Sequence, residues 1–173
     1  DTATVQVQTK SGNVWTSIQT AAVMPGTLHE FDLPDRHVNH TNVNTGGAYR
    51  VISDVPIVAY QFQPIDGVNS FTSDASLLIP TSALDQFYYV AGWGEPSFGD
   101  AQINVVASQD NTQITVKTTV NTVAGGAVPA ITSGTSYTLP QTFNAGDYVQ
   151  IEANNGSFLC TYITANHPIS VIS

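Results

Sequence analysis

The chain has 173 residues, of which 42% are hydrophobic and only 10% are charged, and its 13 acidic and 4 basic side chains give a formal net charge of −9. This length is enough for one ordinary domain, or two small ones, with a core. Four basic residues cannot neutralise a nucleic-acid backbone or hold an anionic membrane surface. No apolar run reaches the roughly 18 residues that cross a bilayer as a helix. The acidic, polar and weakly charged balance is typical of an all-β protein outside the cell.

Alternating apolar and polar residues predict β-strands along the whole chain. In chain order, the predicted strands are 4–8, 56–62, 88–93, 103–107, 113–117 and 148–152, of which 56–62 and 103–107 are β-branched or aromatic runs. Dipeptides of Gly, Pro, Asn and Asp separate these strands, and the best helical candidate is a single turn at Ser82–Phe87. We therefore expect an all-β fold, an antiparallel β-sandwich.

Three segments recur in the same order, at offsets of about 109, 120 and 112 residues. The pairs are Thr4–Thr9 with Gln113–Thr118, Pro25–Phe31 with Ala145–Ile151, and Val51–Ile57 with Ile163–Ile169. We expect one and a half to two tandem related units, a first, possibly incomplete β unit at 1–63 and a second at 64–173. The second unit has additional strands at 88–93 and 103–107, whose counterparts in the first would precede Asp1. The chain is therefore expected to be part of a longer chain, or to carry an incomplete first copy.

Several phrases, in order, resemble the IgGFc-binding-protein N-terminal domain family, in its bacterial type of secreted or surface-attached member. They are Ser73–Thr81, Val105–Thr112, Asn144–Ile151 and Asn166–Val171, and Ser53–Tyr60 repeats the last of them in the first unit. The resemblance implies a secreted or surface-attached modular protein, and the animal members are named for binding antibody Fc. The matching residues belong to turns and core, so the resemblance transfers no binding residue. The chain departs from the family pattern at Asn154–Phe158, where an Asp-Leu-Thr-Gly-like phrase is expected.

Two groups of residues have the chemistry of a metal site. Asp66, Asn69 and Asp74 place oxygen ligands of the kind that Ca²⁺ prefers around one loop, although the EF-hand spacing is absent. His37 and His40, with acidic neighbours, form an alternative site for zinc or copper. The competing interpretation is a hairpin turn at Asp66 and solvated loop histidines. Calcium is the cofactor to test, and otherwise we expect none.

Exposed aromatic rings are the candidates for binding a sugar or a protein surface. Trp93 lies between two glycines, and Trp15 is the other tryptophan. Tyr88 and Tyr89 point to opposite faces of a strand, so at least one of them should pack in the core. Core packing is the alternative for every one of these rings.

Cys160 is the single cysteine. We expect it to be a small buried hydrophobic residue, with a disulfide to a cysteine outside this segment as the alternative. Two Asn-x-Ser/Thr sequons, at Asn39 and Asn155, matter only if the host glycosylates asparagine.

The main hypothesis is a non-catalytic extracellular β module for surface adhesion or glycoprotein recognition, since no nucleophile-elbow phrase is present. The alternative is a structural subunit or spacer of an extracellular filament, sheath or stalk. The expected partners are an extracellular glycoprotein, a glycan or a second copy of the chain, and no nucleic acid.

Overall fold

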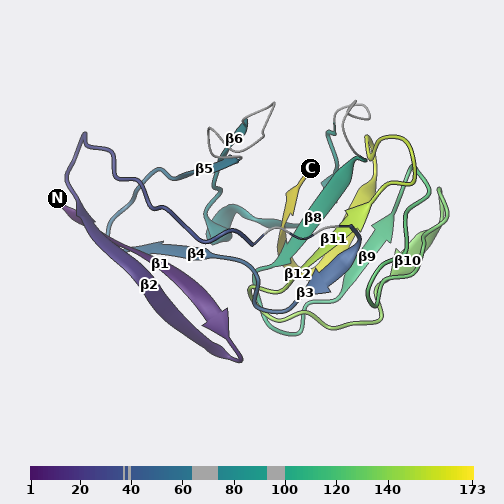
Figure 1. Ribbon diagram of the computed structural model, residues 1–173, viewed down its shortest axis with the longest axis horizontal. Helices are drawn as coiled ribbons and strands as arrows, with labels where there is room; N and C mark the ends of the chain where they lie inside the picture. Colours follow the sequence, from purple (N-terminus) through teal and green to yellow (C-terminus); the bar gives the residue numbers. More distant parts are fainter. Residues whose placement is uncertain (37, 39, 64–73, 93–99) are drawn as a thin grey trace.

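The computed structural model describes residues 1–36, 38, 40–63, 74–92 and 100–173, and its strands form three antiparallel sheets (Figure 1). The first sheet has the order β2-β1-β4, from β1 (Ala3–Ser11), β2 (Val14–Val23) and β4 (Arg50–Ser53). The largest has the order β10-β9-β12-β8-β11-β3, with β7 also paired to β12. Its strands are β3 (Asn42–Asn44), β7 (Asp85–Tyr89), β8 (Gln102–Ala107), β9 (Ile114–Lys117), β10 (Ser136–Thr138), β11 (Tyr148–Glu152) and β12 (Tyr162–Ile172). The smallest pairs β5 (Tyr60–Gln63) with β6 (Asp74–Leu77).

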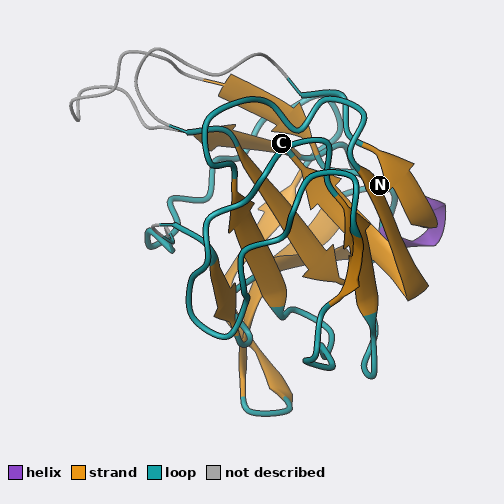
Figure 2. Cartoon of the chain, turned by 90° about the vertical axis from the view of Figure 1, so that its right-hand side faces the viewer, coloured by secondary structure: helices purple, strands orange, loops and turns teal. Residues whose placement is uncertain are grey.

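The hydrophobic core belongs to the seven-stranded sheet, which curls around it (Figure 2). Alternate residues of β8, β9 and β12 point into this core, and Ile103, Ile114 and Ile163 are fully buried. In β11 every residue is buried, because β11 lies between β8 and β3. These strands confirm the all-β antiparallel prediction and give a sandwich-like, half-barrel arrangement.

Apolar side chains are much less covered in the first half of the chain. In the described residues, 14 of the 16 exposed large hydrophobic side chains lie between Val14 and Tyr89. Of its apolar residues, the first sheet buries only Ala3, Val5 and Val7. The purple hairpin of β1 and β2 extends away from the curled sheet, as Figure 1 shows.

The structure corrects three boundaries of the predicted elements. The helical turn is a 3₁₀ turn at Thr81–Ala83, and the residues from Asp85 onward extend as β7 because β12 pairs with them. β7 ends at Tyr89, before the predicted end of that strand. In the predicted strand 56–62, only the residues from Tyr60 are assigned to a strand, where β6 supplies a partner. A run of β-branched and aromatic residues alone does not make a strand where no neighbour completes the ladder.

The segment 36–48 ties the first half of the chain to the large sheet. Gln150 of β11, 4% exposed, donates from its side-chain amide to the carbonyls of Val38 and His40 at 2.7 and 2.9 Å. The buried carboxylate of Asp147 accepts from the backbone N–H of Gly46 at 2.6 Å. β3, which belongs to the predicted first unit, therefore pairs within the sheet of the second. The division of the chain at residue 63 stays a prediction.

Candidate functional site

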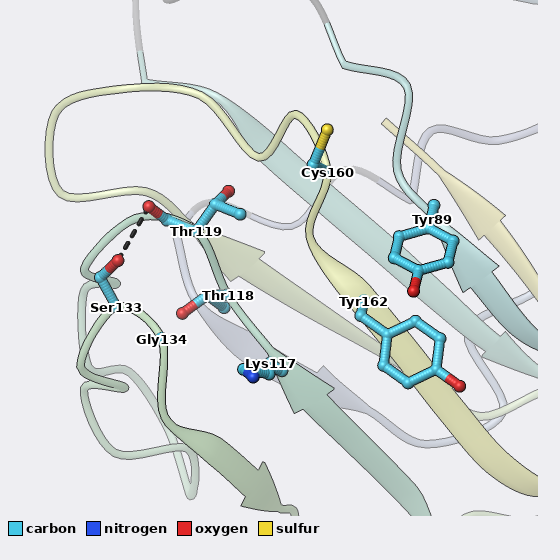
Figure 3. A pocket seen from close by; sticks show the side chains of 8 residues that line it. All are labelled: Tyr89, Lys117, Thr118, Thr119, Ser133, Gly134, Cys160 and Tyr162. Carbon is cyan, nitrogen blue, oxygen red and sulfur yellow. Dashed lines mark hydrogen bonds between the residues drawn. The ribbon is translucent and has the colours of Figure 1, made fainter.

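A groove of about 440 Å³ opens where β7, β9 and β12 meet at one end of the large sheet (Figure 3). Aromatic rings, one ammonium group, hydroxyl groups and one thiol line it. The lining residues are Tyr89, Lys117, Thr118, Thr119, Ser133, Gly134, Cys160 and Tyr162. This volume is within the range of sites for small ligands.

Three of these side chains form a row across neighbouring strands. Tyr162, the first residue of β12, pairs with Tyr89 on one side and with Lys117 on the other. Side chains directly opposite each other on paired strands share a face, and the two tyrosine rings lie 4.8 Å apart with a tilt of 37°. Tyr89 is 72% exposed. The row therefore presents ring surface and a positive charge to solvent together.

Lys117 differs from the other three cations of the chain. The side chains of Lys10, Arg36 and Arg50 donate to carbonyl or side-chain oxygens that join loops and strands. Lys117 has neither a hydrogen bond nor a carboxylate partner in the part of the chain that the structure describes. Its three ammonium donors are thus available to a ligand at the groove.

The opposite wall of the groove is made of hydroxyl residues held by the backbone. Gly134 donates its N–H to the carbonyl of Thr118 at 2.7 Å, and the Ser133 hydroxyl donates to the carbonyl of Thr119 at 2.8 Å (Figure 3). The side chain of Thr119 donates to the carbonyl of Leu159 at 2.9 Å. Thr118 is 1% exposed, and in the described residues its Oγ1 has no hydrogen-bond partner. A buried hydroxyl without a partner is uncommon in folded proteins, and this one lies covered behind the wall of the groove.

The position of Cys160 overturns the expectation of a buried residue. Its thiol is free and exposed at the rim of the groove. The residue has a positive φ of 64° and donates its N–H to Val90 at 2.9 Å. Phe158 is the residue of this turn that enters the core, at 1% exposure, and the left-handed turn sends the thiol outward.

Trp15 is placed as a packing residue between the two sheets. Arg50 stacks over its ring at 4.1 Å. The ring lies so close to Gly146 that a Cβ there would be 2.7 Å from it, and Gly146 has a φ of 88° that only glycine adopts easily. A binding role for Trp15 stays a prediction. Trp93 lies outside the described residues.

The two predicted metal sites are largely outside the described residues. Asp66, Asn69, His37 and the sequon residue Asn39 all lie there, while Asp74 begins β6. His40 Nδ1 lies 2.9 Å from Glu152 Oε2, so this imidazole pairs with one carboxylate. In the described part of the chain, no group of three or more His, Cys, Asp or Glu residues is placed to hold a metal. Binding of Ca²⁺ stays a prediction.

Sequence reasoning found part of the row and missed the rest. Tyr89 was a candidate ring, and its predicted orientation, opposite to the half-buried Tyr88, is confirmed. Lys117 and Tyr162 were missed, because only the pairing of β7 and β9 with β12 brings them to Tyr89. One signal was available: Lys117 is one of only four cations and ends a clean alternating strand.

The curled antiparallel sheet and its solvent-facing groove define an all-β protein with a surface suited to binding. The family model described as IgGFc binding protein matches residues 74–173, which is more than half of the chain and includes every residue of the groove. The chain belongs to the IgGFc-binding protein family, as its phrases predicted. No curated protein and no solved structure matches it. Among the described residues, no helix has the length and apolar character to span a membrane.

Proposed function

We propose that this chain is an extracellular recognition module that binds a glycoprotein through its groove. The observation that carries the proposal is the solvent-facing row of Tyr89, Tyr162 and Lys117, whose ammonium group has no partner in the described residues. The family is described by its binding to IgG Fc, which is itself a glycoprotein, and this description supports a binding role in preference to catalysis.

The groove has the chemistry that a sugar at a protein surface requires. An aromatic ring face packs against the C–H face of a pyranose, and lysine donates to carboxylate or hydroxyl oxygens of a sugar or a peptide. Hydroxyl side chains in a fixed wall add directional hydrogen bonds. One groove of this kind binds weakly, so surface adhesion would need several units on one chain that bind together.

The test uses a glycan array and immobilised IgG Fc, with the whole chain as the probe. Tyr89→Ala removes an exposed ring, and Lys117→Gln removes the charge while keeping most of the stem. We expect each to weaken binding by about tenfold, which corresponds to about 1.4 kcal/mol. Phe62→Ala is the matched control, because Phe62 is 69% exposed on β5 and does not line the groove. Absence of binding to any glycan or Fc, or equal binding by all three variants, would contradict the proposal.

The alternative function, a structural subunit or spacer of a filament, sheath or stalk, requires copies of the chain to associate. Sedimentation velocity over a range of concentrations separates the two functions. Ordered oligomers that grow with concentration favour the structural role, whereas a constant monomer disfavours it.

A further inference from the structure

The first sheet reproduces part of the pairing in the large sheet, residue for residue. With the offsets of 109 and 112 residues found in the sequence, β1 pairs with β4 in the same register as β9 pairs with β12. Val7 lies opposite Val51, and their counterparts Val116 and Ile163 lie opposite each other. The agreement of both offsets with both registers is what two copies of one unit would produce.

At the end of each strand pair, one side-chain oxygen accepts a hydrogen bond from a backbone N–H, and the two bonds join equivalent residues. The backbone N–H of Thr4 donates to Oδ1 of Asp54 at 2.7 Å. The backbone N–H of Gln113 donates to Oδ1 of Asn166, also at 2.7 Å. Gln113 and Asn166 are the counterparts of Thr4 and Asp54 under the same two offsets. Asp54 and Asn166 therefore make the same side-chain bond in the two strand pairs.

The first unit lacks a neighbour that the second unit has. In the large sheet, β8 lies between β11 and the last residues of β12, and it pairs with both. The counterparts of these two partners are residues 28–31 and 57–60. Residues 28–31 and 57–59, all of them described, are in no strand, and Tyr60 pairs only with β6. The first unit thus has a gap in its strand pairing, at the position that β8 occupies in the second unit.

Apolar side chains that would flank the missing strand are more exposed than their counterparts in the second unit. Leu28 is 92% exposed, whereas its counterpart Tyr148 is 9% exposed. Ile57 is 38% exposed, whereas its counterpart Ile169 is fully buried. Residues 55–62 also contain no charged side chain, although proteins commonly protect an open strand edge with charge. An apolar, uncharged edge of this kind favours the addition of a strand.

We propose that this gap takes up a β-strand with the chemistry of β8, donated by a further unit of the same family. Such a strand is extended and uncharged and has branched apolar residues at alternate positions, as β8 does at Ile103 and Val105. A second copy of this chain keeps its own β8 fully buried at these two positions in the centre of the sheet, so the donated strand is one that the donor unit does not itself pair. Donation of the strand would join consecutive units into one continuous β structure.

The test uses a synthetic peptide with the sequence of residues 101–109, labelled for fluorescence anisotropy and added to the whole chain. We expect saturable binding, with new protection from amide hydrogen exchange at residues 57–60. Val58→Pro removes an N–H and the freedom of φ at the edge and should weaken binding at least about tenfold. Val58→Lys places a charge there and serves as the second variant, and circular dichroism checks the fold of both. The controls are Leu159→Lys, at an exposed position of the second unit, and a peptide with proline at its centre.

Three results would overturn the proposal. The first is a folded chain that binds no peptide and gains no protection at 57–60. The second is protection confined to 102–107, which would mean that the peptide exchanges with β8. The third is concentration-dependent dimerisation that Val58→Pro abolishes, which would make a second copy the occupant of the edge. Tyr89→Ala should leave peptide binding unchanged, so a failure of the groove as a binding site is distinguishable from a failure here.

Discussion

Asp147 is one of the buried side chains that attach the 36–48 segment to the large sheet. It is 5% exposed, and its two oxygens accept separate backbone bonds, Oδ1 from Gly46 at 2.6 Å and Oδ2 from Asn144 at 2.7 Å. Each hydrogen bond to a charged acceptor stabilises a protein by about 1.5 to 3 kcal/mol, and a buried donor left without a partner carries its full desolvation penalty. We expect Asp147→Ala to lower the free energy of unfolding by about 3 to 5 kcal/mol.

Asp147→Asn tests whether both oxygens matter. The amide keeps one acceptor and turns an NH₂ group toward the other backbone N–H, so the expected loss is about half, near 2 kcal/mol. Asp110→Ala is the matched control: its carboxylate is 66% exposed and accepts one backbone bond, from Ala145 at 2.9 Å. An exposed group of this kind should contribute less than about 1 kcal/mol.

Urea unfolding at neutral pH, with linear extrapolation, gives the free energies of all three variants. Hydrogen exchange of the β3 amides, measured alongside, shows whether the segment opens locally before the sheet unfolds. The reasoning fails if Asp147→Ala loses less than about 1 kcal/mol, or if it cannot be distinguished from Asp110→Ala.

Three further outcomes follow from single positions. Gly125→Ala should cost about 1 to 3 kcal/mol in thermal or urea unfolding, because its Cβ would lie 1.9 Å from a backbone oxygen, whereas Gly92→Ala, with 3.7 Å of clearance, should not. A backbone N–H bond lowers the pKa of Asp54 from its ordinary 3.8, so its stabilisation is present above that pH and is lost as the pH falls through the folded value, which NMR titration measures. Burial raises the pKa of Tyr148 above 10.0, so its stabilisation persists up to that pH and is lost above it, and an ultraviolet titration compared with Tyr148→Phe should show one late tyrosine.

The sequence predicted those strands whose two faces differ. β8, β9 and β11 stand out because alternate residues are branched and apolar, and each has neighbours on both sides. The predicted strand from Pro56 failed up to Ala59, because its apolar run has no strand partner there beyond one bond, from the N–H of Leu78 to the carbonyl of Ala59. Alternation reports which face a strand would bury, whereas a strand also needs a neighbour that no local pattern reveals.

The groove was less predictable than the fold for a related reason. Tyr89, Lys117 and Tyr162 are separated by 28 and 45 residues in the sequence and meet only through the order of the strands. The two tryptophans are predicted binding residues because of their residue type alone. In the structure, Trp15 packs between Arg50 and Gly146. A row that spans three strands is a property of register, so it becomes visible only when the pairing is known.

The place of β12 has a consequence for how the large sheet forms. β12 pairs with β7 and β9 along its first residues and with β8 along its last, yet it follows all of them in the chain. During synthesis the earlier strands therefore leave the ribosome before the strand that joins them exists. β8 can pair with β11 and β9 with β10 beforehand, but the two pairs join only when β12 is added, and such long-range pairing slows folding. Until its final strand inserts, the sheet is incomplete and exposes apolar surface of the kind that chaperones protect.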